Sequence, residues 1–195
     1  MCAPADAQAG AAPIVCGLLS EIRRATYQAF HQRRLPNRVL FALDEVANIA
    51  PLDELPQIAS EGGGQGLILL AALQDLSQAR VRWGKAADGF LTLFGTKVIL
   101  PGIADQTTLE TVSTALGEYD RRMISTSKVP NREGWMVPTR TVSTQRTRVL
   151  SPGEVANIPA GHALHLDGVR WQLLTAAPAH STEPWKTLTH PTQQA

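Results

Sequence analysis

The distribution of apolar residues along the first hundred positions predicts one long helix and three strands. Twelve small residues without periodicity come first, and we expect segment 1–12 to be flexible. Apolar residues then recur at helical spacing from residue 13 and predict a helix that ends near His31. Continuous apolar runs at 39–43 and 67–73 predict strands that are covered on both faces, because a half-exposed strand would alternate.

A third strand is predicted close to residue 100, and helical segments separate all three. This strand covers residues 96–100 and stops at the Pro-Gly pair that follows. The helical segments are 53–60, 77–83, 85–93 and 106–116, the last with Asp105 as its N-cap. Because strands and helices alternate to about residue 118, we expect an α/β fold with a mostly parallel sheet and helices on both faces.

Beyond residue 118 the pattern changes, and segment 119–178 is predicted to be rich in β-structure. Residues 121–150 combine Thr, Ser, Val and Arg in an alternating order, which is typical of antiparallel strands. Ser151-Pro152 opens a short helix, and a hairpin is predicted around Asp167-Gly168. Residues 13–178 therefore form the expected folded unit, followed by a loose polar tail at 179–195.

The composition indicates a soluble globular domain. The chain has 195 residues, of which 44% are hydrophobic and 18% charged, with a formal net charge of +1. Two cysteines exclude a disulfide framework and a cysteine-based zinc site. The longest apolar run is far shorter than the roughly 18 residues of a membrane span, so we expect no direct membrane insertion and a cytoplasmic location.

The sharpest chemical feature is the pair Asp44-Glu45, which follows the apolar run 39–43. Several buried residues followed by Asp-Glu make the Walker B pattern, in which a rigid strand holds two carboxylates at the edge where ligands bind. Asp44 would hold Mg²⁺ through water, and Glu45 would deprotonate an attacking water. The alternative is an apolar strand that ends in a solvated acidic turn.

Gln74 directly follows the second apolar run. Neighbouring parallel strands end at the same edge, so its carboxamide is expected near Asp44 and Glu45, where it could touch a γ-phosphate or the attacking water. The alternative is a polar residue that caps the following helix.

These motifs carry a family resemblance that covers most of residues 37–167. The chain resembles the C-terminal half of the motor domain of the TraG/TraD/VirD4 coupling proteins of conjugative type IV secretion. The matching segments are LFALDEVANIAPLDELP, SEGGGQGL, AALQDLSQARVRWG, GTKVILPGIADQTTLETVSTALGE and TRVLSPGEVANIPAGHALHL.

The resemblance implies a partial RecA-like P-loop NTPase sheet with a β-rich C-terminal extension. It also implies a hexameric ring of coupling-protein subunits that uses ATP and Mg²⁺ to pump single-stranded DNA bound to a relaxase. Asp44, Glu45 and Gln74 would take the family's Walker B and strand-end glutamine positions. The matched region is the one described as recognising TraM, a relaxosome accessory protein, and the family is anchored at the cytoplasmic face of the inner membrane.

The sequence departs from the family at the phosphate-binding loop. No G-x-x-x-x-G-K-[ST] motif occurs, and the cluster Gly62–Gly66 lacks the lysine and the hydroxyl. Only 38 residues precede the first strand, so we expect a fragment or a truncated product without the P-loop, the all-helical domain and the membrane anchor. The isolated chain is therefore expected to bind no cofactor and to be inactive.

A second departure concerns the glycine cluster itself. Many relatives carry an arginine in this turn that reaches a neighbouring subunit, whereas this chain has Gly63, Gly64 and Gln65. An arginine finger at this position is therefore in doubt.

Segment 121–150 is the most basic part of the chain. It holds seven basic residues and one acidic residue, a local charge of +6. Candidate contacts to a DNA backbone are Arg121, Arg122, Arg140, Arg146 and Arg148. The alternative is a solvated strand face on which cations discourage aggregation.

Two further functions stay open at this point. One is a non-catalytic interaction module, or a truncated remnant, that docks on relaxosome proteins or on intact coupling-protein subunits. The other is a DNA translocase of the FtsK or HerA type, which the segments GIADQTTLE and LSPGEVANIPAG disfavour.

Overall fold

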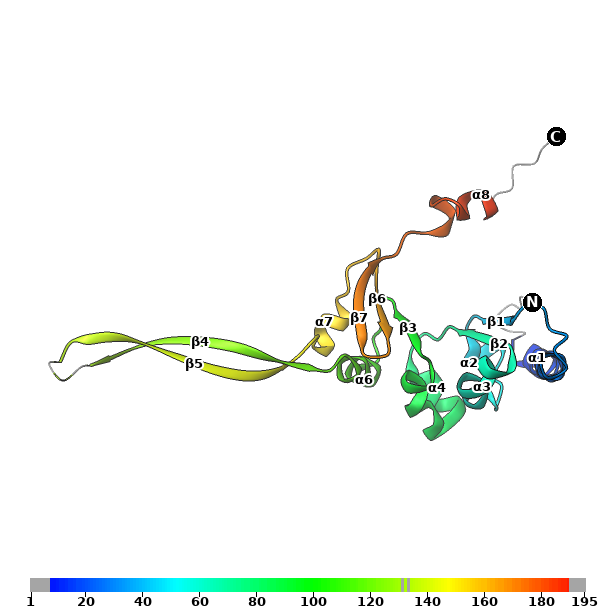
Figure 1. The fold of residues 1–195 in the computed structure, drawn as a ribbon, viewed down its shortest axis with the longest axis horizontal. Helices are drawn as coiled ribbons and strands as arrows, with labels where there is room; N and C mark the ends of the chain where they lie inside the picture. Colours follow the sequence, from blue (N-terminus) through cyan, green and yellow to red (C-terminus); the bar gives the residue numbers. More distant parts are fainter. Residues whose placement is uncertain (1–7, 131, 133, 190–195) are drawn as a thin grey trace.

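The computed structural model describes residues 8–130, 132 and 134–189 (Figure 1). Its first helix, α1, spans Gln8–His31, so residues 8–12 belong to the helix and not to a flexible start as predicted. Alanine, which fills three of these five positions, is the best helix former, and Ala12 is buried, so packing also stabilises this first part of the helix. Residues 1–7 lie outside the described part.

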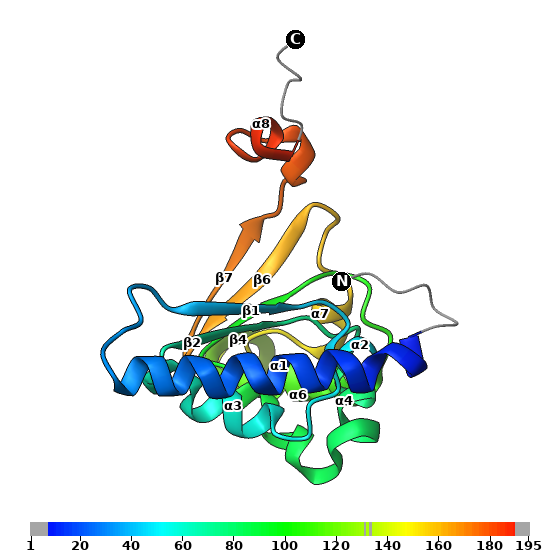
Figure 2. The same cartoon turned by 90° about the vertical axis from the view of Figure 1, so that its right-hand side faces the viewer.

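Strands β1 (Val39–Leu43) and β2 (Leu67–Ala71) form a parallel pair, with Val39 opposite Leu67 and Leu43 opposite Ala71. Helices α1, α3 (Leu55–Glu61) and α4 (Leu76–Trp83) lie on one side of this pair (Figure 2), and the short helix α2 (Val46–Ile49) follows β1 directly. Their inward side chains form the larger core, which includes Phe41, Leu55, Ile58, Leu67 and Phe90. The first two predicted strands are confirmed, although β2 ends two residues earlier than expected.

The opposite face of the parallel pair is uncovered, which corrects the expectation of helices on both faces. Leu40, Ile68 and Leu70 point away from the core and are 56%, 45% and 61% exposed. Successive strand residues point to opposite faces, and the helices that connect these strands all pack on the face of Phe41 and Leu67. An uninterrupted apolar run identifies a strand with two apolar faces, but it does not show what covers the second one.

The third strand, β3 (Thr96–Ile99), does not join the parallel pair. It pairs antiparallel with β6 (His162–Asp167), which in turn pairs antiparallel with β7 (Arg170–Thr175). The prediction of one mostly parallel sheet is therefore wrong for β3. The reason is that β6 supplies Leu164 and Leu166 to a second core against helix α6 (Gln106–Leu116), and β3 completes this layer with Ile99.

The other predicted elements are present with small changes in their bounds. Segment 84–93 is a 3-10 helix, η2 (Gly84–Gly89), followed by α5 (Phe90–Leu93). The glycine cluster forms a further 3-10 helix, η1 (Gly62–Gln65). Helix α7 (Pro152–Ala156) begins with a capping box between Ser151 and Glu154. The expected loose tail contains η3 (Ala179–Ser181) and α8 (Trp185–Thr189), while residues 190–195 lie outside the described part.

Segment 118–148 forms the most extended feature of the molecule. Strands β4 (Glu118–Pro130) and β5 (Met136–Arg148) pair antiparallel along their whole length and project from the body as a twisted two-stranded arm (Figure 1). The expectation of antiparallel strands is thus confirmed. Among the described residues, no helix is long and apolar enough to cross a membrane.

Candidate functional site

Asp44 and Glu45 lie in a tight turn at the carboxyl end of β1. The hydrogen bonding of the parallel pair continues past the strands, since the backbone nitrogen of Ala72 donates to Leu43 O at 2.9 Å and that of Val46 donates to Ala72 O at 3.1 Å. These bonds hold the turn against the strand end of β2. Asp44 is exposed and Glu45 half-buried, so both carboxylates can reach a ligand.

Glu45 adopts a left-handed backbone conformation, with φ 46° and ψ 48°. Residues other than glycine rarely adopt this backbone conformation, and holding one there costs on the order of 1–3 kcal/mol. The Asp44 Oδ1 atom accepts a hydrogen bond from the Glu45 backbone nitrogen at 3.1 Å, and the fully buried Val46 fixes the following residue. A strained, over-determined turn that carries two carboxylates is a feature of functional sites.

Gln74 lies after the end of β2, at the same edge of the parallel pair as Asp44. Its side-chain oxygen accepts a hydrogen bond from the side-chain nitrogen Nε2 of Gln78 at 3.0 Å. The Gln74 side-chain nitrogen makes no hydrogen bond within the described residues and is the group that can donate to a ligand. No hydrogen bond in the described chain joins Gln74 to Asp44 or Glu45, so the three residues share an edge of the parallel pair without being hydrogen-bonded through Gln74.

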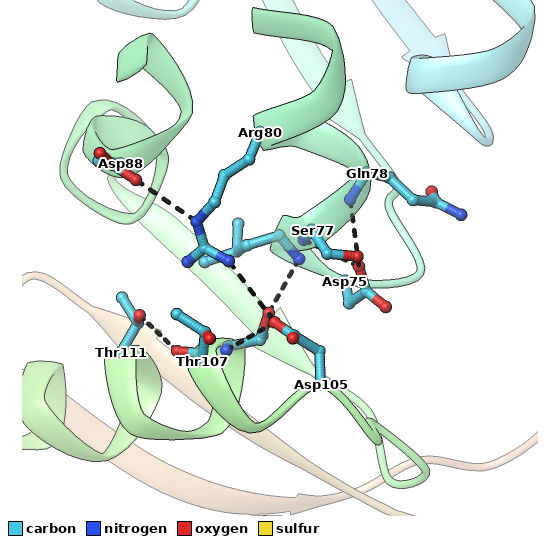
Figure 3. A network of polar contacts seen from close by, with 10 residues as sticks. Asp75, Ser77, Gln78, Arg80, Asp88, Asp105, Thr107 and Thr111 are labelled. Atoms are coloured by element: carbon cyan, nitrogen blue, oxygen red, sulfur yellow. Dashed lines mark hydrogen bonds and ion pairs between the residues drawn. The ribbon is translucent and has the colours of Figure 1, made fainter. Parts of the chain in front are cut away.

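The turn that carries Gln74 is fastened by a polar network (Figure 3). Asp75 caps α4 by accepting hydrogen bonds from the backbone nitrogens of Ser77 and Gln78. One residue further, the backbone nitrogen of Leu76 donates to the hydroxyl of Thr108 on α6 at 3.0 Å. Sequence reasoning missed Gln78 and Thr108, because their partners could not be identified without the packing of α4 against α6.

Asp105 links the same network to a cation. Its Oδ2 atom accepts hydrogen bonds from the hydroxyl and the backbone nitrogen of Thr108, and the Arg80 guanidinium lies 3.6 Å away. The Thr108 hydroxyl, the Thr108 backbone and the Arg80 charge together lower the pKa of the Asp105 carboxyl below its ordinary value. Arg80 also pairs with Asp88 at 3.4 Å, so it bridges η2 and the N-terminus of α6. The predicted N-cap role of Asp105 is confirmed.

The glycine cluster lies at the opposite end of β2 from Gln74. Gly66 has a φ of 82°, and a Cβ atom on it would lie 2.7 Å from the Phe30 ring and 2.8 Å from Leu35. Glycine is thus needed here for the close packing of α1 and its following loop. The Gln65 Oε1 atom is buried and has no hydrogen-bond partner within the described structure.

The donor set around Asp44 consists of carboxylate oxygens, which suit a hard cation such as Mg²⁺. In the residues that the structure describes, no group of three or more His, Cys, Asp or Glu side chains is placed to hold a metal ion. Two carboxylates at a strand edge do not make an all-protein cage. They do match Mg²⁺, which keeps several waters and takes one or two carboxylates together with substrate phosphates.

The five candidate DNA contacts differ in whether they have an acidic partner and in which face of the arm they lie on. Arg146 pairs with Glu118 at 2.9 Å, and Arg148 pairs with Glu110 of α6 at 2.6 Å. The strand register places Arg121 on one face of the arm and Arg122 and Arg140 on the other, where neither has an acidic partner among the described residues. The positive charge of the segment is thus less uniform than its composition indicated. At the end next to the body, Glu118 and Glu110 neutralise Arg146 and Arg148.

The comparisons with known proteins place this chain in one family. Residues 38–160 match the family described as the TraM recognition site of TraD and TraG. This match covers more than half of the chain, and the chain therefore belongs to this family of conjugative coupling proteins. A search of curated proteins finds no match.

Solved structures of the coupling protein TrwB share the fold. The unbound monoclinic form of the bacterial conjugative coupling protein TrwBdeltaN70 is 27% identical, with a TM-score of 0.64 over 85% of this chain and 38% of that one. The complex of TrwB with the non-hydrolysable ATP analogue ADPNP is 25% identical, with a TM-score of 0.59, and covers 85% of this chain and 37% of that one. The complex of TrwB with ADP and Mg²⁺ is 26% identical, with a TM-score of 0.58 and the same coverage. The chain thus spans less than two fifths of the length of these structures.

Proposed function

We propose that this chain is the C-terminal part of the motor domain of a conjugative DNA-transfer coupling ATPase, and that Asp44, Glu45 and Gln74 are its contribution to nucleotide hydrolysis. The observation that carries the proposal is the parallel pairing of β1 and β2, which brings the strained Asp44-Glu45 turn and Gln74 to one edge. The similarity to TrwB complexes with an ATP analogue and with ADP and Mg²⁺ supports it.

Each of the three residues has a distinct role in this proposal. Asp44 would hold Mg²⁺ through water, and the chemistry that the ion would supply there is neutralisation of phosphate charge. Glu45 accepts the proton of the attacking water as a general base. Gln74 uses its free amide nitrogen to orient that water or the γ-phosphate without adding charge, while Gln78 fixes its carbonyl oxygen.

The phosphate cradle of this motor comes from outside the chain, because no P-loop motif occurs in it. The uncovered apolar face of Leu40, Ile68 and Leu70 supports a larger RecA-like sheet, since apolar side chains on a sheet face favour burial. We propose that further strands and helices of the complete motor cover this face. The partners are then other coupling-protein subunits in a ring, a relaxase with its accessory protein, and single-stranded DNA, on the cytoplasmic side of the membrane.

The test is a chimera in which a related coupling protein supplies the P-loop half. Glu45→Gln should lower its kcat about 100-fold or more, because loss of a positioned general base has an effect of this size. Glu61→Gln is the matched control, since Glu61 is exposed and lies beyond the other end of β2. An active chimera with the same kcat for wild type and Glu45→Gln would refute the assignment.

A second candidate function is a non-catalytic module that docks on a relaxosome accessory protein. The matched family, described by its recognition of TraM, favours it. Calorimetric titration of the whole chain with purified TraM, in the absence of nucleotide, tests this candidate separately. Binding that is unchanged in Glu45→Gln would show a docking role independent of hydrolysis.

A further inference from the structure

The β4–β5 arm has no part in the proposed hydrolysis site. It is joined to the body at its base, where Arg148 pairs with Glu110, and just beyond it, where the Ser113 hydroxyl donates to Leu150 O at 2.6 Å. Every described side chain of the arm from Glu118 to Arg146 is exposed. An isolated two-stranded ribbon is marginally stable in water, so a ribbon of this length is expected to bind a partner.

The strand register divides the arm into two faces. Residues directly opposite one another in an antiparallel pair point to the same side. One side carries Asp120 opposite Arg146 near the base and, further out, Arg122 opposite Thr144, Arg140 opposite Thr126, and Lys128 opposite Pro138. We name this the basic face, defined by Arg122, Lys128 and Arg140. Within the described residues, none of these three cations is in an ion pair. The distance along the strand from Arg122 to Lys128 is about 20 Å at the usual rise per residue.

The chemistry of the arm fits a polyanion. Between residues 118 and 148 the sequence has seven basic residues, eight Ser or Thr residues and three acidic ones, Glu118, Asp120 and Glu133, the first two of which lie at the base of the arm. Arginine, lysine and hydroxyl side chains are the groups that contact nucleic-acid phosphates. A second copy of the arm would carry the same excess of positive charge, so pairing of two arms is disfavoured.

The shape of the arm selects a duplex over a single strand. Proteins that bind single strands stack successive bases on aromatic side chains, but the aromatic residues of the arm are only Tyr119 at its base and Trp135 directly before β5, with none along the strands between them. A twisted two-stranded ribbon, by contrast, fits the major groove of a B-form duplex. We propose that the arm binds the phosphate backbone of duplex DNA through the basic face, independently of sequence. This inference goes beyond nucleotide hydrolysis and does not rest on it.

Fluorescence anisotropy of the whole chain with a labelled duplex of arbitrary sequence tests the proposal. With three phosphate contacts the affinity should fall about 40-fold between 50 and 200 mM salt, because each contact contributes a slope of about 0.9. The triple variant Arg122→Gln, Lys128→Gln, Arg140→Gln should lose most of the binding and most of the slope. The control Arg34→Gln, Arg38→Gln, Lys85→Gln removes the same charge from exposed positions outside the arm and should leave the slope unchanged.

Three results would overturn the proposal. The first is absence of duplex binding by the wild-type chain at low salt, and the second is equal binding by the triple variant and the wild type. The third is a preference for the corresponding single strand that is lost in Trp135→Ala. Light scattering of the same variants measures self-association. If the triple variant changes self-association and not DNA binding, the basic face binds a second copy of the chain and not DNA.

Discussion

The hydroxyl of Thr108 on α6 lies 3.0 Å from the backbone nitrogen of Leu76 on α4 and accepts its hydrogen bond. Thr108 is 3% exposed, and its hydroxyl donates in turn to Asp105. Leu76 belongs to the first core and α6 to the second, so this contact ties the two cores together beside the turn that carries Gln74.

Thr108→Val should lower the free energy of unfolding by about 1–3 kcal/mol, because it leaves the buried Leu76 N–H without an acceptor. Urea denaturation of the whole chain measures this change. Thr111→Val is the matched control, since the Thr111 hydroxyl is exposed and bonds only within its own helix. Equal stabilities of the two variants would contradict the role of Thr108.

The lowered pKa of Asp105 predicts a loss of stability in acid. Its folded-state pKa lies below the value in the unfolded chain, so the stabilisation is present above the unfolded pKa. It disappears as the pH falls through the folded-state pKa. The free energy of unfolding measured against pH should therefore have a weaker acid dependence in Asp105→Asn than in wild type. Asp120→Asn on the exposed arm, where no hydrogen bond or ion pair of the described chain holds the carboxyl, should leave the profile unchanged.

Gly66→Ala should destabilise the protein, whereas Gly63→Ala should not. Alanine at position 66 combines a positive φ with contacts under 3 Å to Phe30 and Leu35, so it should destabilise the fold by more than about 1 kcal/mol. At position 63 no atom lies within 4 Å of the new Cβ, and alanine should be neutral or slightly stabilising. Thermal unfolding of both variants checks this, and a stable Gly66→Ala protein would show that α1 can move away.

A reconstituted chimera should respond to arginine at position 63 and not at position 65. Gly63 is exposed with open space around it, whereas the Gln65 side-chain oxygen is buried. If the turn faces the phosphates of a neighbouring subunit, Gly63→Arg should raise kcat by up to about 10³-fold, as arginine fingers do. Gly63→Lys is the control, because it adds a charge without the planar fork. Equal rates for wild type and Gly63→Arg, in a ring confirmed by sizing, would exclude a finger from this turn.

The isolated chain should not hydrolyse ATP. Phosphates that lack a cradle of backbone N–H groups and a lysine lose most of their binding, and neither Asp44 nor Glu45 can replace it. A steady-state assay at millimolar Mg·ATP measures the turnover. Activity that disappears in Glu45→Gln would contradict this prediction.

The local elements of this protein could be predicted from the sequence because their signals are local. The bounds of β1, the cap of α6 by Asp105 and the helix that begins after Ser151 all rest on residues within a few positions of one another. The placement of Asp44, Glu45 and Gln74 at strand ends could also be predicted, since these residues follow apolar runs in the sequence. The parallel pairing of those two runs was predicted from the alternation of strands and helices, and the strand register confirms it.

Tertiary structure decided the partners of these elements. β3 pairs with β6, more than sixty residues later in the chain, because α6 offers an apolar face that both strands cover. Arg148 is neutralised by Glu110, 38 positions away, and only the packing of the arm against α6 brings them together. The strand register likewise separated Arg121 from Arg122 and Arg140. The sequence shows which side chains are apolar and favour burial, and which are charged and favour an oppositely charged partner. Which distant residue becomes that neighbour is determined by the fold, because such contacts depend on chain direction and packing.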